Sequence, residues 1–204
     1  MGKDVFFRSM STRGSQGGLS KSAKLVADVF DACGYDIIIF ETVGVGQIEI
    51  DVIEAVDTVV VTLVPESGDD IQMMKSGIME IADLYAINKA DREGVDRLYT
   101  ALNKILQLNT DDVWLPKIVK TIATTGSGID ELYDKIIDHK IFLNSNSIIK
   151  QKLDNRYVKI VKYLISEKLM EDFWLDKNKG AEKRLNQELK IDYQKRLSPY
   201  EIIK

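Results

Sequence analysis

The sequence has 204 residues, of which 45% are hydrophobic and 29% charged, a composition typical of one globular domain with an appended segment. A net charge of −4 argues against a nucleic-acid partner, and a single cysteine and a single histidine exclude an intramolecular disulfide and the usual zinc ligand sets. No apolar stretch reaches the roughly 18–20 residues of a membrane span and the start lacks a signal-peptide pattern, so we expect a cytoplasmic protein without a membrane partner.

Short apolar runs predict the strands of a parallel sheet. The runs are rich in Ile and Val and lack clean polar alternation, as expected for strands that are covered on both faces. The fifth run is the weakest, because Lys120 interrupts it. The predicted strands are Val5–Phe7, Ile37–Phe40, Thr58–Val64, Leu84–Ile87 and Ile118–Ile122.

Helical patterns separate these runs. Apolar residues recur at helical spacing in four segments, at Leu25–Cys33, Ile71–Ile81, Leu98–Leu106 and Ile129–Ile137. Gly34 is well placed as the C-terminal cap of the first helix. Alternation of strand and helix over about 120 residues predicts a doubly wound α/β domain.

The character of the chain changes at Asn144. A turn-like linker, residues 144–147, precedes two highly charged helical stretches at about 148–172 and 181–196. Such helices cannot bury themselves alone, so they pack back on the domain or form a partner interface. We therefore predict an α/β domain over residues 1–143 and a helical extension over residues 144–204.

The first unusual loop is Glu41-Thr-Val-Gly-Val-Gly-Gln47, directly after a predicted strand. In an open parallel sheet, ligands bind beyond the carboxyl ends of the strands. An acid there can bind Mg²⁺, and Gly44 would let a backbone N–H approach a phosphate oxygen. The alternative is a tight glycine turn with an incidental Glu.

The second loop is Asn88-Lys-Ala-Asp91. The Asp91 carboxylate can accept two parallel hydrogen bonds, which match the N1–H and amino donors of guanine, whereas adenine has no such donor pair. Asn88 can tie neighbouring loops together and the Lys89 stem can cover one face of the base. The alternative is a polar turn in which Asp91 caps the helix that follows.

The third loop is Thr121-Ile-Ala-Thr-Thr-Gly-Ser-Gly128, from which a backbone N–H could reach the guanine O6; a simple turn is the alternative. The phosphate-binding pattern G-x-x-x-x-G-K-[ST] does not occur in the sequence. The segment Gly14–Ser22 does not supply it, because Ser15 and Ser20 stand where the glycines should be. A mobile Gly/Ser loop leading into the helix that follows is the more plausible reading of Gly14–Ser22.

Taken together, five segments resemble the MeaB/ArgK family of P-loop GTPases, the bacterial relatives of the human methylmalonic aciduria type A protein. The resemblance implies a P-loop NTPase-type doubly wound sheet that lacks its N-terminal strands and phosphate loop and carries a helical C-terminal extension. The segments are RSMSTRGSQGGLS (8–20), ETVGVGQIE (41–49), PESGDDIQMMKSGIMEIAD (65–83), NKAD (88–91) and GSGIDEL (126–132).

The resemblance implies binding of GTP or GDP with Mg²⁺ and hydrolysis of GTP. It also implies a chaperone of methylmalonyl-CoA mutase or a related cobalamin-dependent acyl-CoA mutase, which gates adenosylcobalamin loading and protects the mutase. The helical extension of the family supports a homodimer. The alternative is a non-catalytic module that dimerises or docks on the mutase without hydrolysing GTP.

On the phosphate side, the resemblance implies that Glu41 belongs to the Mg²⁺ shell and Gly44 to the switch that senses the γ-phosphate. Gln47 lies in the same switch and is a catalytic candidate. The loop 66–75 matches a segment that responds to the mutase, and Lys75 within it is a candidate for stabilising transition-state charge.

On the base side, Asn88, Lys89 and Asp91 match the guanine-specificity motif and Ala123 the backbone contact to the base. Ile122 stands where the family usually has Ser, so only a backbone contact is expected there. Without the phosphate cradle, the resemblance implies that this chain alone hydrolyses GTP negligibly.

Overall fold

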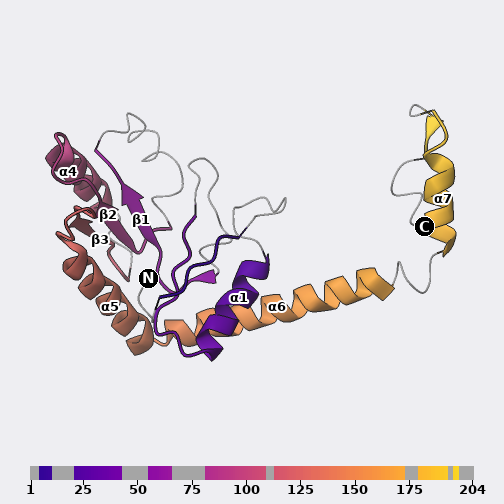
Figure 1. Cartoon of the computed structure of the whole chain (residues 1–204), viewed down its shortest axis with the longest axis horizontal. Helices are drawn as coiled ribbons and strands as arrows, with labels where there is room; N and C mark the ends of the chain where they lie inside the picture. The colour runs from indigo at the N-terminus through magenta and orange to yellow at the C-terminus, as the bar shows by residue number, and fades with distance from the viewer. Residues whose placement is uncertain are drawn as a thin grey trace. The chain divides into compact units, whose positions relative to one another are not determined.

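The computed structural model describes residues 5–10, 21–42, 55–65, 81–108, 113–172, 179–192 and 195–197 (Figure 1). The chain forms two compact units, Met1–Lys152 and Leu153–Lys204. The first unit contains the sheet and the candidate site, and the second contains most of the charged helical tail.

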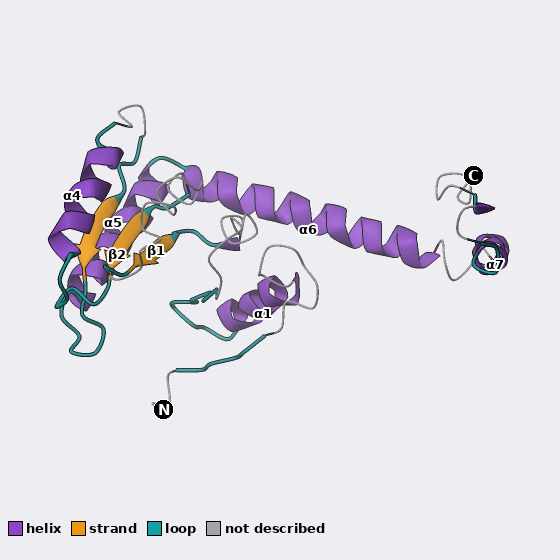
Figure 2. Cartoon of the chain, turned by 90° about the horizontal axis from the view of Figure 1, so that it is seen from above, coloured by secondary structure: helices purple, strands orange, loops and turns teal. Residues whose placement is uncertain are grey.

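A three-stranded parallel sheet is the centre of the first unit (Figure 2). The strands β1 (Val60–Leu63), β2 (Leu84–Ile87) and β3 (Lys117–Lys120) lie in the order β1-β2-β3. Both strand pairs are parallel, with Leu84 opposite Val60 on one side and opposite Lys117 on the other. The predicted parallel α/β sheet is confirmed for these strands, and the predicted limits of β2 match its observed limits.

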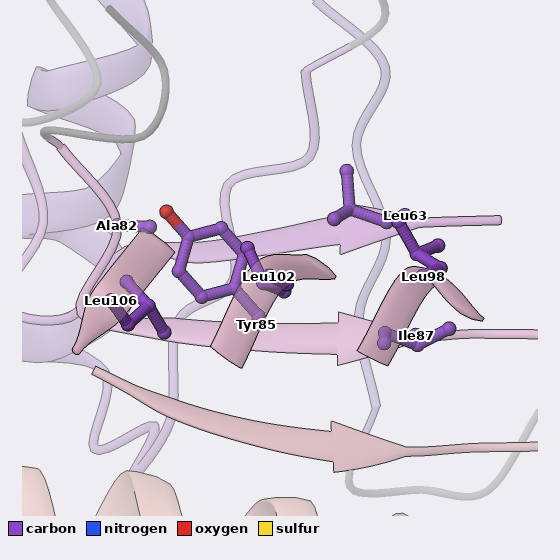
Figure 3. Close-up of a cluster of buried hydrophobic side chains, with 7 residues drawn as sticks. All are labelled: Leu63, Ala82, Tyr85, Ile87, Leu98, Leu102 and Leu106. Atoms are coloured by element: carbon purple, nitrogen blue, oxygen red, sulfur yellow. The ribbon is translucent and has the colours of Figure 1, made fainter. Parts of the chain in front are cut away.

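The central strand β2 is buried over its whole length, which explains its continuous apolar sequence. Tyr85 and Ile87 face one side of the sheet and pack against α4 (Val95–Leu106), as Figure 3 shows. Leu84 and Ala86 face the other side and are equally buried, and α5 (Ile129–Ser145) packs against β2 and β3.

The cluster between α4 and the sheet confirms the apolar stripe predicted for that helix. Its buried helical residues are separated by one turn each, so all three point toward the sheet. Burial raises the pKa of the Tyr85 hydroxyl to about 12. The buried members are Leu63, Ala82, Tyr85, Ile87, Leu98, Leu102 and Leu106.

A buried histidine anchors α5 to the amino-terminal edge of the sheet. His139 is 1% exposed, with Nδ1 2.8 Å from Thr58 Oγ1 and Nε2 3.4 Å from Asp83 Oδ1. The same Asp83 accepts the Val59 N–H at 2.7 Å through Oδ2, and its carbonyl accepts the Trp114 indole N–H at 2.9 Å. These contacts connect the residues before β1, the residue before β2, and the segment leading into β3.

The charge state of His139 follows from its surroundings. Burial lowers its pKa below the usual value, the Asp83 charge opposes this shift, and Lys152 adds to it, while Asp57 raises the pKa by a smaller amount. The net direction is downward, so the neutral imidazole is the favoured form. A neutral ring can donate one hydrogen bond and accept one, which suits a hydroxyl on one side and a carboxylate on the other.

Two of the predicted strands are not strands in the structure. The segments Val5–Phe7 and Ile37–Phe40 are described as irregular chain, and neither pairs with β1. A strand is stabilised by backbone hydrogen bonds to a neighbour, so an apolar run without one does not form a ladder. Helix α1 (Lys21–Ala32) lies between these segments, and Gly34 has the positive φ of 86° expected of its cap.

The tail is helical, as predicted. Helix α6 (Ile148–Asp172) has the predicted limits, whereas α7 (Lys179–Glu188) ends eight residues before the predicted 196. The predicted linker is also shorter, because α5 continues through Ser145. None of the α6 residues is buried, and no helix in the described ranges is long and apolar enough to cross a membrane.

Truncating the core at Leu102 tests the packing of α4. Leu102 is fully buried in the cluster, so Leu102→Ala should lower the free energy of unfolding by about 2–5 kcal/mol through lost burial and a cavity. Leu169→Ala is the matched control, since Leu169 is 63% exposed on α6, and it should change stability by less than about 0.5 kcal/mol. Urea denaturation measures both, and equal losses would contradict the assigned core.

Titration of His139 should make stability depend on pH. Because its pKa is lower in the folded state than the unfolded value of about 6.5, the unfolded chain binds more protons below that pH. The free energy of unfolding should therefore fall as pH drops from about 7.5 toward 5.5. His139→Gln retains hydrogen bonding without titrating, so its urea denaturation series should have a shallower slope near pH 6; identical slopes would refute the assignment.

Candidate functional site

The sheet brings two of the three unusual loops together at its carboxyl edge. Asn88 continues the ladder past β2, because its N–H donates to the Leu63 carbonyl at 2.8 Å. Thr121 continues it past β3 in the same way, donating its N–H to the Ile87 carbonyl at 2.8 Å. The parallel register therefore places the Asn88 and Thr121 loops side by side.

The Asn88 side chain ties these two loops. Its Oδ1 accepts the Ala123 N–H at 3.1 Å and lies 3.4 Å from the Thr121 hydroxyl, a weaker contact. A second hydrogen bond joins the same two loops, because the Ala90 N–H donates to the Thr121 carbonyl at 3.0 Å. The tie expected of Asn88 is present in the structure. The Ala123 N–H already has an acceptor, so a guanine O6 would have to share it.

Lys89 and Asp91 occupy the outer part of the second loop. Lys89 has a left-handed φ of 56°, a conformation that is uncommon for non-glycine residues and often found at functional sites. Asp91 is exposed. The helix that follows is capped by Gly94, with a φ of 93° and no side-chain cap, so the alternative role of Asp91 as the cap of α4 is wrong. Its carboxylate is not used by the helix.

The third loop is held in shape by its own backbone and by one close approach. The Ile122 N–H donates to the Ser127 carbonyl at 2.9 Å and the Gly126 N–H to the Ile122 carbonyl at 3.0 Å. Gly128, with a φ of +75°, lies so close to β3 that a Cβ would sit 2.1 Å from the Lys120 carbonyl oxygen. Only glycine fits, so this contact fixes where the loop leaves the strand.

An ion pair links β3 to α4 beside these loops. Lys120 Nζ lies 2.7 Å from Asp96 Oδ1 and 4.8 Å from the centre of the Tyr99 ring. The Asp96 side chain is 88% exposed, so solvent screens the pair and its contribution to stability is small. Sequence reasoning missed this pair and the Thr121 contact, because both depend on the strand register and neither follows from a local motif.

The remaining predicted residues are not gathered at this site. Glu41 is exposed at the end of the irregular segment that follows Phe40, while Gly44, Gln47 and Lys75 lie outside the described residues. In the ranges that the structure describes, no three His, Cys, Asp or Glu side chains are grouped closely enough to hold a metal ion. Of the predicted site residues, the structure therefore brings together those of the second and third loops.

The fold and loops define a class of protein. A parallel sheet with Asn-Lys-x-Asp after one strand and a tied loop after the next corresponds to part of the nucleotide-binding domain of a P-loop GTPase. A crystal structure of a LAO/AO transport system kinase has the same fold, with a TM-score of 0.60 and 28% identity over 89% of this chain and 59% of that one.

The family profile "Methylmalonyl Co-A mutase-associated GTPase MeaB" matches residues 1–178, and the chain belongs to this family. A protein of Pyrococcus abyssi whose name describes it as a GTPase is 48% identical over 79% of this chain and 51% of its own length. The GTPase ArgK of Escherichia coli is 33% identical over 81% of this chain and 52% of its own length. The mouse mitochondrial methylmalonic aciduria type A homolog is 32% identical over 83% of this chain and 42% of its own length. The chain thus spans about half the length of the curated relatives it matches.

The close approach at Gly128 can be tested against a second left-handed glycine in the same loop. Gly126 has a φ of +79° with no atom within 4 Å, so Gly126→Ala should cost only the conformational strain of about 1–2 kcal/mol. Gly128→Ala should cost roughly 1–3 kcal/mol more, because the methyl group would overlap the Lys120 carbonyl.

Thermal and urea unfolding give the two stabilities, and the amide chemical shift of Ala123 reports on the loop. The Ala123 signal should move in Gly128→Ala and stay close to its original position in Gly126→Ala. Equal stabilities of the two variants would contradict the role of Gly128 in fixing the loop.

Proposed function

We propose that this chain carries the guanine-recognising part of a GTPase that serves as a chaperone for a cobalamin-dependent acyl-CoA mutase in the cytoplasm. The observation that carries the proposal is the hydrogen-bonded tie between Asn88 and Ala123, which joins the two loops at the carboxyl edge of the sheet. Membership of a family described as associated with methylmalonyl Co-A mutase supports the choice of partner.

Base recognition would rest on Asp91 and Ala123. The exposed Asp91 carboxylate would accept hydrogen bonds from guanine N1–H and the amino group. The Ala123 N–H would be shared between Asn88 Oδ1 and guanine O6. Adenine offers neither donor pair nor carbonyl, so its binding would leave these groups unpaired. Lys89 lies between Asn88 and Asp91, and its aliphatic stem would cover one face of the base.

Phosphate binding and hydrolysis would fall to the other predicted residues. Glu41 would bind Mg²⁺, Gly44 and Gln47 would respond to the γ-phosphate, and Lys75 would stabilise charge in the transition state. Positioning of phosphates in this class also needs a phosphate cradle, whose sequence pattern does not occur in these 204 residues. We therefore propose that the 204-residue chain hydrolyses GTP negligibly by itself.

The helical extension would serve association. We propose a division at residues 143 and 144, with residues 1–143 forming the G-domain part and residues 144–204 supporting a homodimer. Helix α6 supports this assignment, since it has no buried residue and carries apolar side chains that are about half exposed or more. These side chains include Leu153, Tyr157, Leu164, Ile165 and Leu169.

A second candidate function follows from the same helix. The chain would then be a non-catalytic module that dimerises or docks on the mutase through its tail and the loop 66–75, without hydrolysing GTP. The exposed apolar side chains of α6 favour this alternative as much as they favour dimerisation within a GTPase. Nucleotide binding separates the two candidates.

Calorimetric titration of the chain with GDP and GTP, with and without Mg²⁺, tests the guanine site. We expect binding of guanine but not adenine nucleotides, weakened at least about tenfold in Asp91→Asn because one of the paired acceptors is lost. Glu93→Gln removes one negative charge from an exposed position two residues away and should leave affinity unchanged. Absence of guanine nucleotide binding by a folded sample would favour the non-catalytic module.

A further inference from the structure

The loop that presents Asp91 is attached to the neighbouring strand at both of its ends. At the first end, the Ala90 N–H donates to the Thr121 carbonyl at 3.0 Å. At the second end, where α4 begins, Asp96 Oδ1 lies 2.7 Å from Lys120 Nζ. Lys120 and Thr121 are consecutive residues, so a single point of the chain, the end of β3, holds both ends of this loop.

Side-chain capping does not fix the start of α4. Gly94 occupies the cap position with a left-handed φ of 93° and makes no side-chain cap hydrogen bond. Glycine has more backbone freedom than any other residue, so the direction of the chain between Asp91 and the helix has to be fixed by a contact elsewhere. Asp96 lies in the first turn of α4, and its ion pair with Lys120 is such a contact.

The Lys120 side chain makes a second contact with the same helix. Its Nζ lies 4.8 Å from the centre of the Tyr99 ring, a distance at which an ammonium group is attracted to the face of an aromatic ring. Tyr99 follows Asp96 by three residues, so both side chains lie on the same side of α4. The two contacts of Lys120 together fix where this helix begins relative to β3.

The ion pair is better suited to positioning the loop than to stabilising the fold. The Asp96 side chain is 88% exposed, and solvent screening leaves such a pair little effect on overall stability. Two parallel hydrogen bonds to one carboxylate, however, require that both oxygens lie within a narrow range of distances and angles. A small displacement of the Asp91 loop would therefore break one of them.

We propose that Lys120 is a positioning residue for guanine recognition. Through its ion pair with Asp96 and its contact with Tyr99, it holds the loop so that both oxygens of Asp91 meet the N1–H and amino donors of the base. Lys120 would act through α4 and not by touching the base. This inference rests on the proposed function, because it concerns the same base site.

The test compares GDP with inosine diphosphate, whose base keeps the N1–H and O6 but lacks the amino group. GDP should bind the unmodified chain at least about tenfold more tightly, because Asp91 gains a second charge-assisted hydrogen bond. Lys120→Met keeps the aliphatic stem and removes the charge, and it should lower this affinity ratio about two- to fivefold. Lys120→Arg keeps a cation at this position and should preserve the ratio.

Matched variants separate positioning from general effects of charge and stability. Lys104→Met removes the same charge from an exposed position in the last turn of α4 and should leave the ratio unchanged. Asp96→Asn breaks the pair from its exposed side, so it should lower the ratio about as far as Lys120→Met. The double variant should lower it no further, because both changes remove one interaction. A general loss of stability would weaken both nucleotides equally.

Nuclear spin relaxation of the backbone amides of residues 91–94 distinguishes failure of this inference from failure of the proposed function. In the nucleotide-free chain, their mobility should rise in Lys120→Met and Asp96→Asn and stay unchanged in Lys104→Met. If the chain binds no guanine nucleotide, the proposed function fails, and relaxation alone decides whether Lys120 holds the loop; unchanged relaxation in Lys120→Met then overturns the proposal. If nucleotide binds, an unchanged ratio in Lys120→Met or an equal fall in Lys104→Met overturns it.

Discussion

The structure depends on one buried strand, β2. Its four residues form the middle of the parallel ladder and are buried on both faces, so β1, β3 and α4 are all placed by contact with it. The ladder continues beyond the strand ends, through the Asn88 N–H to Leu63 and the Thr121 N–H to Ile87. Because the register is fixed by these bonds, the two loops that carry the candidate base-recognition residues are held next to each other before any ligand arrives.

The two edges of the sheet have different roles. At the amino edge, the buried His139 contacts Thr58 and Asp83, and these contacts anchor α5. At the carboxyl edge, Asn88 fixes the loops while Asp91 and Lys89 stay exposed. Buried polar groups must be satisfied internally, and the contacts at the amino edge meet this requirement for His139.

In P-loop GTPases, base recognition and phosphoryl transfer depend on different groups of residues. Base recognition needs a few donors and acceptors on rigid loops, and the residues proposed for it here lie on two loops that Asn88 joins. Phosphoryl transfer needs a cradle, a cation and positioned switch residues, which come from several parts of a complete domain. The described residues hold the Asn88 and Asp91 loop in order, and Gly44, Gln47 and Lys75 lie outside them.

Local sequence determined the elements whose stability is local or whose burial is complete. The apolar run of β2, the helical stripe of α4, the limits of α6 and the cap at Gly34 could all be predicted, because periodicity and glycine conformation encode them directly. The Asn-Lys-x-Asp loop and its position after a buried strand could also be predicted from the sequence. The family could be named from short motifs for the same reason, since these motifs are contiguous.

Only the tertiary structure decided what depends on neighbours. Ile37–Phe40 has strand composition but is not a strand, because composition cannot supply the hydrogen-bonding partner that a ladder requires. The Asn88–Ala123 tie, the Lys120–Asp96 pair and the contact of Gly128 with the Lys120 carbonyl join different loops and strands through register and close approach. These distances are set by how the strands align in space, which no local pattern of residues specifies.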